Sequence, residues 1–174
     1  MDLTPSPEAN AILDQVRKMF EQDILPRNRE MIRSTKQDGE LDPPFLDELR
    51  AKAKSMGLWN MAHTDLTDRQ PGLSMSNLDY SIVAELLGRA FWSSKVFNCQ
   101  WPDVPNMVAL QRYATEEQKE QWLKPLLDGD CQSAFAMTEP GAASSDAKNI
   151  AATITPDGDD YIVDGRKWYI TGGG

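Results

Sequence analysis

The sequence has few of the residues that build metal sites and hydrolytic active sites. Among 174 residues there is one histidine, His63, and there are two cysteines, Cys99 and Cys131, without a CxxC spacing. So few soft ligands exclude a metal cluster, and both cysteines are expected to be small buried thiols. Serine and cysteine hydrolases need a histidine base, whereas His63 lies in a polar stretch that favours a solvated, non-catalytic imidazole.

The sequence also lacks positive charge and long apolar runs. Eighteen Lys and Arg residues against 27 Asp and Glu residues give a formal net charge of −9. A phosphate backbone would be repelled, so nucleic acid is not expected as a partner. No apolar run reaches the roughly 18 residues that a membrane span needs. The start, MDLTPSPEANAILDQ, has no basic or apolar leader, which predicts a cytoplasmic protein.

The first 131 residues have the periodicity of α-helices. Apolar residues from Ile12 to Ile24 fall on one face, and Pro26 predicts a kink that leaves either a stop or a continuation to about Ser34. Four further helices are predicted from their caps and apolar faces. They run from Asp42 to Gly57, from Ser76 to Gly88, from about Pro105 to Leu110, and from the capping box Thr115–Gln118 through Trp122, Leu123 and Leu126 to Gly129.

After Asp130 the pattern changes to the two-residue period of strands. Ala134 to Met137 is a short apolar run, and Asp157-Gly158 marks a turn. Asp164-Gly165 predicts a two-residue hairpin turn, with residues 166–171 as the return strand. These segments predict antiparallel elements.

The two patterns together predict an α+β chain with two domains. Residues 1–131 are expected to form an all-α helical domain, and residues 132–174 the first strands of an antiparallel, barrel-like β domain. So few strands cannot close a sheet or protect its edges. The chain is therefore expected to be the front part of a larger protein, or to need a partner that completes the sheet.

The most informative motif is FAMTEPGAASSD, at residues 135–146. Its small side chains allow backbone amides to approach a ligand closely, and the hydroxyl groups of Thr138, Ser144 and Ser145 add donors for carbonyl or phosphate oxygens. A tight polar turn without a ligand explains the motif equally well. The glycines at 172–174 lack the spacing of a dinucleotide-binding loop.

This motif, followed by DGRKWYITGGG, resembles the acyl-CoA dehydrogenase family, whose middle β domain opens with similar segments in the same order. The resemblance extends upstream through ATEEQKEQWLKPLLDGD and SNLDYSIVAELLGRA and covers essentially the whole chain. VFNCQWPDVPNM and the spacing of TEPGAASSD are similar to the branch that includes animal proteins with an attached aminoglycoside-phosphotransferase-like kinase domain.

The resemblance implies an oxidoreductase of fatty acid β-oxidation that binds FAD and an acyl-CoA thioester. In this family a glutamate removes the α proton while a hydride leaves the β carbon for flavin N5. An electron-transfer flavoprotein then takes the electrons, and the resemblance implies a homodimer or homotetramer. An acyl-CoA oxidase or a nitroalkane-oxidising relative would share the architecture.

The resemblance also implies which residues contact the flavin. Met137 and Thr138 are expected to bond the pyrimidine edge, Thr171 to reach N5, and Tyr169 to pack on the flank. One more serine of the motif is expected between the flavin phosphates and the substrate, and the count back from Asp146 favours Ser145 over Ser144. The full predicted set of cofactor-binding residues is Phe135, Met137, Thr138, Ser144, Ser145, Tyr169, Ile170 and Thr171, with Ser145 also contacting substrate.

No catalytic residue is expected within the chain. Glu139 is a carboxylate inside the motif, but it precedes Pro140 in the family's structural turn, and the family's catalytic glutamate is expected beyond Gly174. Glu85 and Asp79 are interpreted as solvated charges on a helix. The chain alone is therefore expected to be inactive. The alternative, from another functional class, is a non-catalytic partner subunit or scaffold of a flavin-bearing chain.

Overall fold

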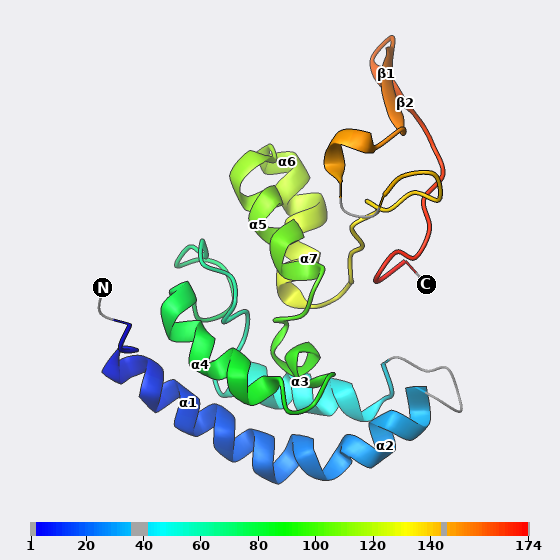
Figure 1. The fold of residues 1–174 in the computed structure, drawn as a ribbon. Helices are drawn as coiled ribbons and strands as arrows, with labels where there is room; N and C mark the ends of the chain where they lie inside the picture. Colours follow the sequence, from blue (N-terminus) through cyan, green and yellow to red (C-terminus); the bar gives the residue numbers. More distant parts are fainter. Residues whose placement is uncertain (1–2, 36–41, 144–145, 174) are drawn as a thin grey trace. The chain divides into compact units, whose positions relative to one another are not determined.

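The structure is a computed structural model that describes residues 3–35, 42–143 and 146–173. The chain divides into two compact units, Met1–Cys131 and Gln132–Gly174. The first unit is helical, and the second contains two antiparallel strands (Figure 1). This arrangement confirms the predicted fold class. Within the described ranges, no helix is both long enough and apolar enough to cross a bilayer.

The helical unit begins with one long, bent helical run (Figure 1). Helix α1 (Pro7–Met19) starts at Ser6, whose hydroxyl oxygen accepts a hydrogen bond from the Ala9 amide at 3.1 Å. A π-helical turn at Phe20–Ile24 and a 3₁₀ turn at Leu25–Arg27 connect it to α2 (Asn28–Arg33). Pro26 has no amide hydrogen to donate within the helix, so the run bends there but continues, which is one of the two predicted outcomes.

Helices α3 (Phe45–Ser55) and α4 (Asn77–Leu87) pack beside this run (Figure 1). The hydroxyl oxygen of Ser76 caps α4 by accepting from the Asp79 amide at 3.0 Å, as its sequence predicts. The predicted helix start at Asp42 is wrong, since α3 begins after Pro44 without a side-chain cap. The Asp42 carboxylate instead forms ion pairs with Arg50 and Lys95.

The last helical part comprises α5 (Asp103–Tyr113), α6 (Glu116–Gln118), a π-helical turn at Lys119–Leu123 and α7 (Lys124–Asp128). The capping box is present, with Thr115 and Gln118 each accepting from the other's backbone amide. Trp122 is 55% exposed, whereas its neighbour Leu123 is buried in the core.

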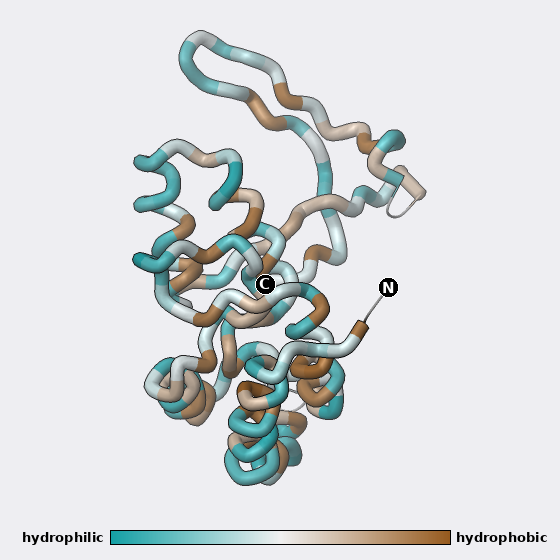
Figure 2. Tube along the Cα trace, turned by 90° about the vertical axis from the view of Figure 1, so that its left-hand side faces the viewer, coloured by the Kyte–Doolittle hydropathy of each residue, from teal (hydrophilic) through white to brown (hydrophobic). Residues whose placement is uncertain are grey.

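Two apolar clusters form the core of the helical unit. In Figure 2 the hydrophobic residues of each helix lie on the side toward the neighbouring helices, and the hydrophilic residues lie on the outer side. The larger cluster joins α1–α4, and its largest fully buried members are Trp92, Phe20, Phe97 and Met19. The smaller cluster joins α5 to the segment that follows it and contains Met107, Leu123, Leu126 and Leu127.

The second unit carries a hairpin of β1 (Thr153–Asp157) and β2 (Asp160–Asp164), with Thr153 opposite Asp164. The predicted turn after Asp157 is present. The predicted turn at Asp164-Gly165 and the return strand over residues 166–171 are wrong, and residues 134–137 form no strand either. Gly165 is needed for another reason. A Cβ atom there would lie 2.6 Å from the Cβ of Ala152, so glycine allows the two segments to pack closely.

Candidate functional site

Two segments that are far apart in the sequence lie side by side in the second unit. The hydroxyl group of Thr138 donates a hydrogen bond to the carbonyl oxygen of Trp168. The amide of Trp168 in turn donates to the carbonyl oxygen of Thr138 at 3.2 Å. These two bonds join the motif at residues 135–139 to the segment at 167–171, so the two sequence motifs meet at one place.

Glu139 connects three parts of this unit. Its carboxylate accepts from Lys167 Nζ at 2.8 Å and from the amides of Ala151 and Ala152 at 2.7 and 2.9 Å. The ammonium of Lys167, followed by these two amide donors, lowers the pKa of Glu139 to about 2. A carboxylate that is ionised at all physiological pH values and bonded on both oxygens is a structural anchor and a poor proton acceptor.

Lys167 makes a second contact on the same side. Its Nζ donates to the carbonyl oxygen of Met137 at 3.0 Å. Sequence reasoning missed Lys167 and the two alanine amides, because their role depends on contacts across 12 to 30 residues. The only local signal is a lysine within an otherwise apolar and aromatic stretch, KWYI.

The predicted site residues of the first segment use some of their donors within the chain. The Met137 amide donates to the carbonyl oxygen of Phe135 at 3.0 Å, and the Thr138 hydroxyl is bonded to Trp168. The Thr138 amide donates to no residue that the structure describes. Phe135 is 51% exposed, whereas Met137 and Thr138 are half-buried. Ser144 and Ser145 lie outside the described residues.

The second segment presents aromatic surface and a hydroxyl group. Tyr169 is 88% exposed and has a φ of 49°, an unusual backbone conformation for a tyrosine. Its ring meets that of Trp168 edge-on, with the ring centroids 5.0 Å apart. Ile170 is half-buried. Thr171 is exposed, and neither its amide nor its hydroxyl has a hydrogen-bond partner among the described residues.

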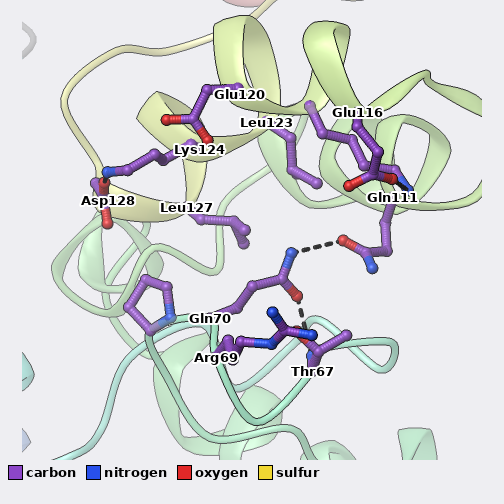
Figure 3. Close-up of a pocket in the computed structure, with 12 residues that line it drawn as sticks. Thr67, Arg69, Gln70, Gln111, Glu116, Glu120, Leu123, Lys124, Leu127 and Asp128 are labelled. Atoms are coloured by element: carbon purple, nitrogen blue, oxygen red, sulfur yellow. Dashed lines mark hydrogen bonds and ion pairs between the residues drawn. The ribbon is translucent and has the colours of Figure 1, made fainter.

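A separate pocket of about 590 Å³ lies within the helical unit (Figure 3). Its apolar floor includes Leu123 and Leu127, and its rim carries three cationic and three acidic side chains. Gln70 crosses the opening, bonded to Gln111 at 2.7 Å and to the Thr67 amide at 2.9 Å. The balanced charges of the rim favour neither an anionic nor a cationic ligand.

The histidine and cysteine predictions are partly wrong. His63 is fully buried, and this burial lowers its pKa. Its Nδ1 accepts a hydrogen bond from the Asp65 amide at 3.2 Å. The loop around it is polar, but the ring faces the protein interior. Cys131 is exposed and Cys99 is half-buried, with no disulfide between them. Within the described ranges, no three His, Cys, Asp or Glu side chains are placed to hold a metal ion.

The sequence matches two family models, "Acyl-CoA dehydrogenase, N-terminal domain" over residues 6–130 and "Acyl-CoA dehydrogenase, middle domain" over residues 134–174. Acyl-CoA dehydrogenase family member 11 from Gallus gallus is 40% identical over 174 residues, which are 97% of this chain and 22% of that protein. The chain thus spans about a fifth of this relative.

Two solved structures extend the comparison. A candidate acyl-CoA dehydrogenase from Mycobacterium abscessus has a TM-score of 0.84 at 43% identity, covering 97% of this chain and 43% of that chain. The structure of PigA with FAD and proline has a TM-score of 0.72 at 25% identity, covering 98% of this chain and 42% of that chain.

Proposed function

The chain belongs to the acyl-CoA dehydrogenase family, and on this premise we propose that it is the amino-terminal part of an FAD-dependent acyl-CoA dehydrogenase. Residues 1–131 would be the N-terminal helical domain and residues 132–174 the start of the middle domain. The relatives extend well beyond the length of this chain, which supports a catalytic glutamate located after Gly174.

One observation carries this proposal. The two motifs that resemble flavin-contacting segments are hydrogen-bonded to each other through Thr138 and Trp168. They offer the amide of Thr138, the amide and hydroxyl of Thr171, and an exposed aromatic surface at Tyr169. Hydrogen-bond donors beside an aromatic surface fit the polar edge and the flat face of an isoalloxazine ring, and PigA, a structural relative, is described with FAD.

The residues of this chain would bind and orient the cofactor. When bound, FAD would supply the hydride acceptor for α,β-desaturation of an acyl-CoA. The Thr138 amide would donate to the pyrimidine edge, where reduction places negative charge, and Thr171 would donate near N5. Phe135, Met137, Tyr169 and Ile170 would border the ring, and Ser144 or Ser145 would bond the phosphates, with Ser145 also touching the substrate.

The same proposal includes electron transfer to an electron-transfer flavoprotein and assembly into a homodimer or homotetramer, and family membership supports both.

The proposal is tested by purifying the full-length protein. It should copurify with yellow FAD in a stoichiometric amount, and an acyl-CoA should bleach the flavin absorbance under anaerobic conditions. A colourless full-length protein that cannot be reconstituted with FAD would contradict the proposal and favour a non-catalytic scaffold.

A further inference from the structure

We infer that Lys167 is a positioning residue that aims the Thr138 amide at the flavin, an inference that rests on the proposed function. The Thr138 amide belongs to the peptide group between Met137 and Thr138. Its carbonyl oxygen, on Met137, accepts from Lys167 Nζ at 3.0 Å. In a trans peptide the C=O and N–H bonds point in opposite directions. Lys167 therefore turns the Thr138 N–H away from itself.

The orientation is fixed because Lys167 is itself held at two points. Its Nζ is bonded to the Glu139 carboxylate at 2.8 Å, and the side chains of Lys167 and Glu139 are only 24% and 6% exposed. The next residue, Trp168, exchanges two hydrogen bonds with Thr138. Lys167 thus holds the carbonyl end of the Met137–Thr138 peptide group, and Trp168 holds the side chain and the carbonyl group of Thr138, which follow that peptide group.

The positive charge contributes beyond its geometry. A cation on the carbonyl oxygen of a peptide group polarises the group and makes the N–H at its other end a stronger donor. The Thr138 N–H has no acceptor within the described residues. An unpartnered N–H that is polarised in this way suits the carbonyl-rich edge of a reduced flavin better than an unpolarised N–H does.

The inference is tested with the FAD-loaded full-length protein in four variants. Lys167→Met removes the charge and keeps an unbranched side chain one atom shorter, while Lys167→Arg keeps a cation. Glu139→Gln leaves the contact between Lys167 and Met137. Lys148→Met is the matched control, because Lys148 is an exposed lysine of the same unit whose side chain makes no ion pair or hydrogen bond with the described residues.

The readouts are the FAD dissociation constant of the apoprotein, the visible spectrum of the bound flavin, and the melting temperature of the apoprotein. Lys167→Met should weaken FAD binding about tenfold, as the loss of a charge-assisted hydrogen bond does, and should shift the flavin spectrum. Lys167→Arg should restore most of the affinity, and Lys148→Met should match the wild type. Glu139→Gln should lower the melting temperature, but it should weaken FAD binding less than Lys167→Met does.

Two outcomes would overturn the inference. One is a Lys167→Met protein that binds FAD with wild-type affinity and spectrum, whether or not its melting temperature falls. The other is a Glu139→Gln protein in which FAD binding is weakened as strongly as in Lys167→Met. If the wild-type protein itself binds no FAD, the proposed function fails instead, so the two failures are distinguishable.

Discussion

The side-chain amide of Asn98 donates a hydrogen bond to the side-chain oxygen of Asn60 at 2.7 Å inside the helical unit. Both residues have left-handed backbone conformations, with φ of 53° and 56°. Asn98 also donates to the carbonyl oxygen of Leu126 at 2.8 Å, and Asn60 donates to that of Leu127 at 2.9 Å. The pair therefore satisfies the carbonyl groups at the end of α7 and attaches this helix to the larger core.

Replacing Asn98 should be strongly destabilising. Asn98→Ala would leave the buried side-chain oxygen of Asn60 without its donor, would remove one of the two donors to the Leu126 carbonyl oxygen, and would place alanine at a positive φ. The combined loss should be about 3 kcal/mol in the free energy of unfolding. Asn98→Gly loses the same hydrogen bonds but has no backbone strain, so it should be the milder of the two. Denaturant titration of the chain measures both. Equal losses would show that backbone strain contributes nothing at this position.

Gly129 ends α7 with a φ of 75°, and a Cβ atom there would lie 2.7 Å from Cζ2 of Trp59. Gly57 has a similar φ of 71° but has no atom within 4 Å of such a Cβ. Gly57→Ala should therefore cost only the backbone strain, about 1 kcal/mol. Gly129→Ala should cost clearly more, because the Trp59 ring must also move. The difference in denaturation midpoint between these variants checks the prediction, and it fails if their midpoints coincide.

Gly165 allows a close approach that no other residue can make. Gly165→Ala would bring a Cβ atom to 2.6 Å from Cβ and 3.0 Å from Cα of Ala152, beside the amides that bond Glu139. We expect the second unit to lose about 1–3 kcal/mol of stability, the usual cost of overpacking. Gly141→Ala is the control, because nothing lies within 4 Å of the position that its added methyl group would take. Limited proteolysis should cleave the second unit faster in Gly165→Ala but not in Gly141→Ala.

His63 should make stability depend on pH in the mildly acidic range. Burial lowers its pKa in the folded state below the ordinary value of about 6.5, and Arg112 adds to this while Asp65 opposes it. The unfolded chain therefore binds the proton first, so stability is full above about pH 6.5 and falls as the pH drops toward the folded-state pKa. Urea titrations of wild type and His63→Gln between pH 7.5 and 5 should show a steeper loss in the wild type. Parallel curves would contradict the prediction.

Local patterns in the sequence predicted most helices of the helical unit, although not the start of α3. The capping box at Thr115, the cap at Ser76 and the apolar faces act within one or two helical turns, so residues close in sequence decide them. The change to a two-residue period after Asp130 also predicts that a second unit of extended segments begins near residue 132. The motifs FAMTEPGAASSD and DGRKWYITGGG carry the family resemblance.

The tertiary structure decided what depends on distant partners. His63 is buried because of packing that its polar neighbours do not reveal, and Gly165 faces Ala152 instead of forming a turn. Lys167 reaches Met137 and Glu139 across about 30 residues, a pairing that no local period encodes. Charge, size and periodicity are properties of single residues and their near neighbours, whereas the orientation of a peptide group at a binding site depends on which remote side chain can contact it.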